Sequence, residues 1–203
     1  MDFRYIDEGH EYLLDGVHIP SLTQMLDADG LNAHLDEAPA GVVQAKAEWG
    51  TRLHFALQKA EYGFGIEEEF KQHCVDWLDL SRKMGWGYPG NPIWQKCELP
   101  VLAQVEGFVF GFTPDRVAPA AVVEIKGTYS PAVSHGIQVA LQVIGMDYPR
   151  STPRFVAYFD KQGIKKLVTC GPTVKRDNQQ IDVFAEADRI IFEHALAWEG
   201  ALV

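Results

Sequence analysis

Apolar residues alternate with small or polar ones along two stretches in the middle of the chain, which is the pattern of β-strands. Residues 107–113 alternate three phenylalanines with small residues, and residues 121–126 read Ala-Val-Val-Glu-Ile-Lys. Successive side chains of a strand point to opposite faces of its sheet. Glu124 and Lys126 therefore share one face of a strand whose other face is apolar. The pattern predicts two opposite charges that point the same way from a sheet.

Four longer segments repeat their apolar residues every three or four positions, the period of one helix face. They predict helices at about 39–62, 66–84, 131–147 and 178–199. The predicted stripe of the first helix consists of Val43, Ala47, Gly50, His54 and Leu57. Within such a stripe His54 is either a satisfied core residue or a metal ligand.

The third of these helices carries a polar face. His135, Gln138 and Gln142 lie on that face, and apolar residues lie on the opposite one. On one interpretation the polar face is simply solvated. On the other, Gln138 holds Lys126 or a phosphate, because its amide can both donate and accept a hydrogen bond.

Turn and capping residues indicate the remaining elements. Asp15-Gly16 predicts an N-terminal hairpin, Ser21 predicts the cap of a short helix, and the Gly/Pro-rich residues 85–92 predict a connection. Further strands are predicted at residues 93–102, 154–160 and 164–170.

The resulting order of elements, α-βββ-α-β, predicts a mixed α/β (α+β) fold with a central mixed β-sheet flanked by helices. A length of 203 residues is typical of one domain. We therefore expect a single domain over 1–203, in which residues 1–90 form an N-terminal hairpin and a helical elaboration of the core.

Composition limits the class of protein. Apolar residues make up 47% of the chain, which is ample for a core. No apolar run approaches the length of about eighteen residues that a membrane span needs, and the N-terminus is charged, so we expect neither a span nor a signal peptide. Three widely spaced cysteines argue against a disulfide framework or a zinc or iron-sulfur site. A cytoplasmic location is predicted.

The formal net charge of −10 argues against a nucleic-acid partner, because Lys and Arg normally supply most of the affinity for phosphate. Two bound divalent cations would add four positive charges where a phosphate sits. Basic residues also accompany the motifs, and these are Arg52, Arg116, Lys161, Lys165 and Lys166. The expected binding of nucleic acid is therefore weak and metal-dependent.

The candidate chemistry depends on Asp115, which follows a proline shortly before the second strand. Continuing the alternation of residues 107–113 puts Asp115 on their small-residue side, so pairing of the two strands would bring it to Glu124 and Lys126. Two carboxylates suit a hard divalent cation such as Mg²⁺, and an adjacent lysine can orient a water for hydrolysis of a phosphodiester. The alternative is an exposed Glu124–Lys126 ion pair and a turn aspartate.

The segment from Pro114-Asp115 to Glu124-Ile125-Lys126 resembles the signature of the PD-(D/E)xK nuclease superfamily, and within it the RecB-type exonucleases. The match consists of a literal Pro-Asp pair followed after eight residues by Glu-x-Lys. Such a spacing also occurs by chance, so the flanking motifs matter.

Three flanking motifs match in the right order. Gly50 to His54 is similar to the G-x-x-x-H that places a metal-binding histidine on an early helix. Gln138 to Gln142 is similar to the later Q-x-x-x-Y, with a glutamine in place of the tyrosine. Residues 15–23 look like the lead-in of some phage nucleases and of the mitochondrial genome maintenance exonuclease. The resemblance extends over about residues 12 to 170.

The resemblance implies a role for each residue. One or two Mg²⁺ or Mn²⁺ ions would be held by Asp115, Glu124, the Ile125 carbonyl and His54. Lys126 would position the attacking water. Gln138 and Arg116 would support these residues or contact phosphate, and Glu98 is a weaker candidate on the preceding strand.

The function implied by the resemblance is a metal-dependent deoxyribonuclease. It would be an exonuclease that acts on single-stranded DNA or duplex ends in phage or bacterial recombination or repair, with a recombination protein as a further partner. The alternative is a protein of the nuclease fold that binds nucleic acid or a partner protein without cutting. The acidic charge and the missing tyrosine favour this alternative, whereas Asp115, Glu124 and Lys126 favour the enzyme.

Overall fold

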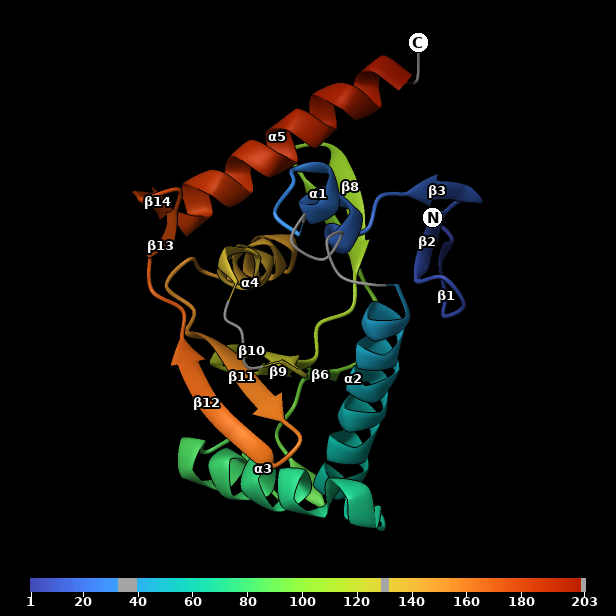
Figure 1. Cartoon of the computed structure of the whole chain (residues 1–203). Helices are drawn as coiled ribbons and strands as arrows, with labels where there is room; N and C mark the ends of the chain where they lie inside the picture. Colours follow the sequence, from blue (N-terminus) through green and yellow to red (C-terminus); the bar gives the residue numbers. More distant parts are fainter. Residues whose placement is uncertain (33–39, 129–131, 202–203) are drawn as a thin grey trace.

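The computed structural model describes residues 1–32, 40–128 and 132–201 (Figure 1). The first residues of two predicted helices, 39 and 131, lie outside this part of the chain. The N-terminal part contains three short strands and then helices: β1 (Phe3–Ile6), β2 (Glu11–Leu14), β3 (Val17–Ile19), α1 (Leu22–Ala28), α2 (Ala40–Glu61), the 3-10 helix η2 (Glu68–Phe70) and α3 (Lys71–Met84). Among the described residues, no helix combines the length and the apolar character that crossing a membrane requires.

Strands dominate the rest of the described chain, with a helix in their midst and another at the end. The middle part contains β4 (Gly87–Tyr88), β5 (Asn91–Pro92), β6 (Lys96–Cys97), β7 (Val101–Val105), β8 (Phe108–Phe112), β9 (Arg116–Ala118) and β10 (Ala121–Lys126). The last part contains α4 (Val133–Gly145), β11 (Arg154–Asp160), β12 (Gly163–Thr169), β13 (Thr173–Arg176), β14 (Gln179–Asp182) and α5 (Val183–Ala201).

A five-stranded mixed sheet forms the centre of the fold, in the order β12-β11-β10-β9-β6. Strands β10 and β11 are parallel, and α4 connects them. The other neighbouring strands of this sheet are antiparallel. Figure 1 shows α4 on one side of the sheet and α3 on the other, so the predicted mixed sheet flanked by helices is confirmed.

The two faces of the sheet bury two hydrophobic clusters, as the alternation of β10 requires. Val122 and Val156 face a cluster built with α1, β7, β8, α4 and α5. Val123 and Ile125 face a second cluster built with α2 and α3. Glu124 therefore lies on the α4 side, as the sequence pattern predicts, and its surroundings there are buried rather than solvated.

The predicted strand 93–102 is wrong as a single element. It is divided into β6 and β7 by a bend at Glu98, whose φ is 51°, and Pro100 lies two residues further on. Strand β7 pairs with β8 rather than continuing the central sheet. The strand at 107–113 consequently does not pair with β10, which pairs with β9 and β11. Asp115 reaches β10 from the bend after Pro114, not from β8.

The predicted closing helix starts too early. Residues 179–182 form β14, which pairs with β13 around Asp177 and Asn178, and both turn residues have positive φ (49° and 65°). This is the backbone that two-residue hairpins need and that Asp and Asn tolerate. Helix α5 begins at Val183, where the Asp182 carboxylate accepts hydrogen bonds from the next backbone amides.

The N-terminal hairpin forms as predicted, with Asp15 and Gly16 at the turn between β2 and β3. This small sheet is anchored to β8 through Tyr12. Its ring packs on Gly111, where an added Cβ would overlap the ring, and its hydroxyl pairs with Thr113 Oγ1 at 2.9 Å. The small-residue side of β8 is therefore covered at Gly111 by Tyr12.

Candidate active site

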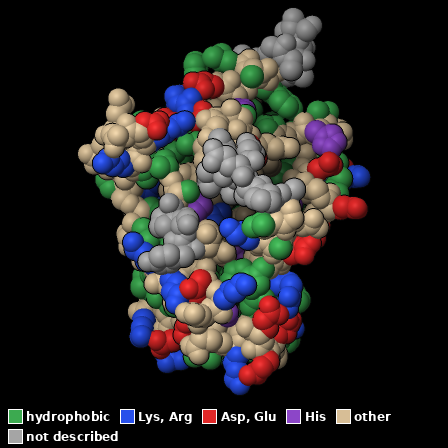
Figure 2. Space-filling view, viewed as in Figure 1, with side chains coloured by type: hydrophobic (Ala, Val, Ile, Leu, Met, Phe, Trp, Pro, Cys, Tyr) green, Lys and Arg blue, Asp and Glu red, His purple; other side chains and the backbone are tan. Residues whose placement is uncertain are grey.

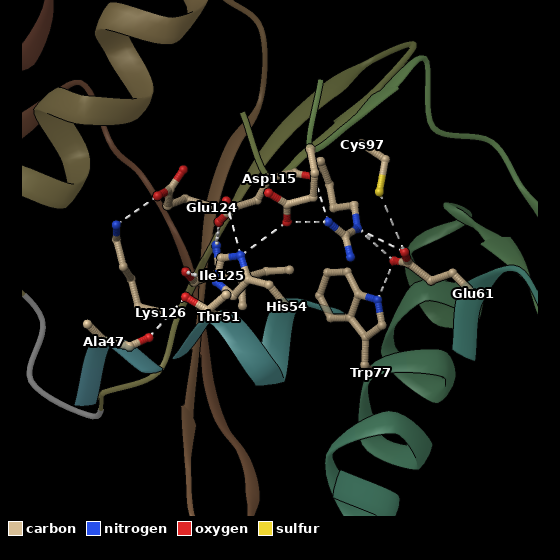
Figure 3. Close-up of polar contacts among 12 residues, drawn as sticks. Ala47, Thr51, His54, Glu61, Trp77, Cys97, Asp115, Glu124, Ile125 and Lys126 are labelled. Atoms are coloured by element: carbon tan, nitrogen blue, oxygen red, sulfur yellow. Dashed lines mark hydrogen bonds and ion pairs between the residues drawn. The ribbon is translucent and has the colours of Figure 1, made fainter. Parts of the chain in front are cut away.

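The site begins where strands β9 and β10 separate. Their pairing ends at Val123 opposite Arg116, so the next backbone groups of β10 on that side need other partners. The Ile125 amide donates to Asp115 Oδ2 at 2.5 Å, and the Ile125 carbonyl lies 3.1 Å from His54 Nε2. Figure 3 shows Asp115 and His54 meeting at this strand edge. The end of the pairing between β9 and β10 thus places the Asp115 carboxylate and the His54 imidazole side by side.

Three side chains from separate elements form the candidate metal centre. His54 Nδ1 lies 3.1 Å from Glu98 Oε1 and 3.4 Å from Asp115 Oδ1. One ligand atom from each of the three residues lies within 4.8 Å of the others. Glu98, the weaker candidate in the sequence, is a full member of this cluster because the bend before β7 turns it toward His54.

The predicted stripe of α2 is partly wrong. Ala47 is exposed, and the buried residues of the helix are Leu53, Ala56, Leu57, Ala60 and Glu61. His54 lies beside this buried stripe, and its side chain is 23% exposed. It also lines a cavity. His54 is therefore accessible from the cavity, as a metal ligand must be, and its role as a metal ligand stays a prediction.

Electrostatics link the three members of the cluster. Burial would lower the pKa of His54, but the carboxylates of Asp115 and Glu98 raise it to about 9. Burial and the nearby Glu124 raise the pKa of Asp115. The pKa of Glu98 is lowered despite burial, because His54 and Arg116 stabilise its anion. A protonated His54 donates from both ring nitrogens here, so its positive charge offsets part of the negative charge of the cluster.

These ligands fit a divalent cation. Carboxylate and carbonyl oxygens suit Mg²⁺ and Mn²⁺, and an imidazole shifts the preference toward a transition metal such as Mn²⁺. His54, Glu98 and Asp115 supply one nitrogen and two carboxylates within reach of one ion. His54 would have to release a proton to bind it.

Glu124 is held from both sides of its carboxylate. Its Oε1 accepts hydrogen bonds from Lys126 Nζ and Gln138 Nε2, both at 2.7 Å. Its Oε2 accepts from Gln142 Nε2 at 2.9 Å. The interpretation of Glu124 and Lys126 as an exposed ion pair is wrong, because Glu124 is buried. Glu124 lies outside the His54 cluster, and its role as a metal ligand stays a prediction, as does that of the Ile125 carbonyl.

The polar face of α4 is part of the site rather than solvated. Gln142 is 1% exposed, and its side-chain amide holds Glu124. Gln138 donates to Glu124 and not to Lys126, and its contact with a phosphate stays a prediction. Both glutamines fix the orientation of that carboxylate.

Lys126 completes the site at the cavity surface. Burial would lower its pKa, but Glu124 and Asp115 raise it. The ammonium therefore stays protonated at neutral pH. It can donate hydrogen bonds to a water or a phosphate oxygen.

Of the two predicted roles of Arg116, the structure fits support of the other site residues and not contact with a phosphate. Its side chain is wholly buried, and its Nε lies 2.9 Å from Glu61 Oε2. Its Nη1 donates to Glu98 Oε1 at 2.9 Å. Arg116 therefore cannot contact a phosphate in this structure, and instead it fixes the carboxylate of Glu98.

Glu61 is the residue that sequence reasoning missed. Its carboxylate is buried and accepts a hydrogen bond from Trp77 at 2.5 Å (Figure 3). It also accepts from Trp94 at 3.0 Å and from Arg116. The signal in the sequence was an acid at the helix period of Leu53 and Leu57. An acid at an apolar position indicates a buried partner of opposite charge.

The site opens into a cavity of about 790 Å³. Its walls come from the N-terminal sheet, α1, α2, β8, β10 and α4. Asp115, Glu124, Lys126 and His54 all line it. The metal-ligand cluster and the lysine therefore face one shared space.

Comparison with known proteins gives little further guidance. No protein-family model matches the chain, and no curated protein matches it. Among solved structures it is similar to a protein called SSO0001, with 14% identity and a TM-score of 0.46 over 89% of this chain and 78% of the other. It is also similar to a candidate exonuclease from Eubacterium rectale, with 14% identity and a TM-score of 0.45 over 85% and 77%. Likeness at this level says nothing about activity or substrate.

Proposed function

We propose that the protein is a metal-dependent nuclease that hydrolyses phosphodiester bonds of DNA. The observation that carries this proposal is the cluster of His54, Glu98 and Asp115, which faces the same cavity as Lys126. A nitrogen and two carboxylates next to a fixed ammonium suit hydrolysis at phosphorus better than the chemistry of an uncharged substrate. The order of the sequence motifs supports the same assignment.

The site residues have separate roles in the proposed reaction. Asp115, Glu98 and the neutral form of His54 would hold Mn²⁺ or Mg²⁺, with Glu124 and the Ile125 carbonyl as the further predicted ligands. When bound, the metal supplies Lewis-acid stabilisation of the phosphate and lowers the pKa of a water. Lys126, kept protonated by Glu124 and Asp115, orients that water or a phosphate oxygen.

The supporting residues hold these groups in place before substrate arrives. Gln138 and Gln142 fix Glu124, the Ile125 amide fixes Asp115, and Arg116 fixes Glu98. Groups that are already oriented stabilise developing charge without the cost of reorganisation. Assignment to phage or bacterial recombination or repair, in a cytoplasmic setting and with a recombination partner, rests on the resemblance of the motifs alone.

We further propose that cleavage starts at a strand end. The cavity is walled by the N-terminal sheet, α2 and α4, and a strand threaded between such walls needs a free terminus. Linear single-stranded DNA should therefore be degraded with Mn²⁺, whereas a closed circle of the same sequence should survive much longer. Gel analysis of both substrates during one time course measures the difference.

The possible results of that assay separate three functions. Comparable rates for circle and linear strand would rule out entry from an end and indicate an endonuclease with the same catalytic residues. Degradation of neither substrate at any concentration of Mn²⁺ or Mg²⁺ would favour the alternative, a non-cleaving protein that binds nucleic acid or a partner.

A further inference from the structure

The charges around the cavity do not provide a path for a phosphate backbone. Among the described residues that line it, Lys126 is the one Lys or Arg, and the lining acids are Asp7, Glu98, Asp115 and Glu124. On the face drawn in Figure 2, Lys and Arg side chains around α3 lie interspersed with Asp and Glu. Arg52 pairs with Glu67 and Glu69 outside the cavity. Any polymer bound here must be held largely by something other than lysine and arginine.

Aromatic side chains line the same cavity. From the N-terminal sheet, a series of rings runs outward from the anchored Tyr12 to Tyr5, with 5.1 Å between their centroids, and then to His10. The Tyr5 hydroxyl pairs with His10 Nδ1 at 2.7 Å, which fixes the orientation of the outer rings. Both Tyr5 and His10 line the cavity.

A further ring comes from α2. Phe55 directly follows the cluster residue His54, lines the cavity, and is 57% exposed. The Lys59 ammonium lies 5.3 Å from the centroid of the Phe55 ring, so a positive charge accompanies this exposed aromatic. Phe55 belongs to neither hydrophobic cluster of the described residues, so its ring does not serve the core.

We infer that Tyr5 and Phe55 form a stacking subsite for the unpaired bases of a single-stranded nucleic acid that enters the candidate active site. The inference rests on the proposed function and adds what holds the substrate. Every base offers a π-face, so stacking on aromatic side chains binds a strand irrespective of its sequence. In a duplex the faces of the bases are already stacked on their neighbours. The subsite therefore selects unpaired strands.

A docking site for another protein is the competing explanation of an exposed phenylalanine. The position of Phe55 favours bases, since Phe55, Tyr5 and the metal-ligand cluster share one cavity.

The test measures binding of three fluorescent probes by anisotropy in Ca²⁺: a 12-nucleotide oligothymidine, an abasic strand of the same length, and a 12-base-pair duplex. We expect Phe55→Ala and Tyr5→Leu each to weaken binding of oligothymidine by about 5- to 150-fold, the loss of one stacked base. Binding of the abasic strand should stay unchanged. Phe192→Ala is the matched control, since Phe192 is 60% exposed on α5 and does not line the cavity.

Two results would overturn the subsite: unchanged affinity for oligothymidine in both variants, or an equal loss for the oligothymidine and abasic strands. Failure of the wild-type protein to bind oligothymidine would overturn it as well. Hydrolysis of bis(p-nitrophenyl) phosphate with Mn²⁺ tests the proposed function separately, because this small diester has no bases. Hydrolysis of this diester without base-dependent binding of the strands would contradict the stacking subsite alone. Absence of its hydrolysis would contradict the proposed nuclease function.

Discussion

Replacing Lys126 by alanine is expected to lower the rate of DNA cleavage by about 10²- to 10³-fold, the usual cost of losing one preorganised group that stabilises charge. The affinity for Mn²⁺ should persist, because His54, Glu98 and Asp115 do not depend on Lys126 for their contacts. Cleavage of a labelled oligonucleotide and calorimetric titration with Mn²⁺ measure the two quantities on the same preparation.

A matched lysine serves as control for this variant. Lys83 is 72% exposed on α3, where it pairs with Asp79, so Lys83→Ala should leave both quantities unchanged. If Lys126→Ala lost Mn²⁺ affinity and cleavage to the same extent, Lys126 would be a structural partner of Glu124 and not a group that acts on the substrate.

Replacing Glu61 by alanine is expected to lower the free energy of unfolding by about 3–5 kcal/mol, because it leaves the wholly buried Arg116 without its main anionic partner. Denaturation by urea, followed by tryptophan fluorescence, measures the change. The same variant should weaken Mn²⁺ binding, since Arg116 also positions Glu98.

Two further variants isolate the cause of that instability. Glu69→Ala removes an exposed partner of Arg52 and should cost at most about 1 kcal/mol. The double variant Glu61→Leu with Arg116→Met replaces the buried pair by apolar groups and should recover much of the lost stability. A cost for Glu61→Ala no larger than that of Glu69→Ala would show that the buried pair contributes little.

The alternation in β10 could be read from the sequence because it depends only on the strand's own period. Glu124 and Lys126 point to the α4 side, and Val123 and Ile125 to the other side, as that period demands. The spacing of Gln138 and Gln142 likewise puts both amides on one helix face, and the structure directs both to Glu124. Features that depend on the period of a single helix or strand can therefore be predicted from the sequence.

Features that depend on contacts between elements far apart in the sequence could not be predicted from local patterns. Glu61 and Arg116 are 55 positions apart, and no local pattern links them. The positive φ of Glu98 turns its side chain toward His54. The sequence pattern places this residue in the middle of a strand and so does not predict the turn. The hairpin of β13 and β14 was missed because Ile181 continued the apolar period of α5, although Asp177-Asn178 carried a turn signal.

The most direct test of the metal-dependent nuclease is a time course of a single-stranded 30-nucleotide oligomer, labelled at one end, with the wild-type protein and with Asp115→Asn. Asp115 is one of the three cluster residues and lies 3.4 Å from His54, and the substitution nearly preserves its shape while removing an anionic metal ligand. We predict progressive shortening by the wild type in Mn²⁺, none in EDTA, and a loss of at least about 10²-fold in the variant. Cleavage that persists in EDTA, or that is equal in both proteins, would contradict a metal-dependent site at Asp115.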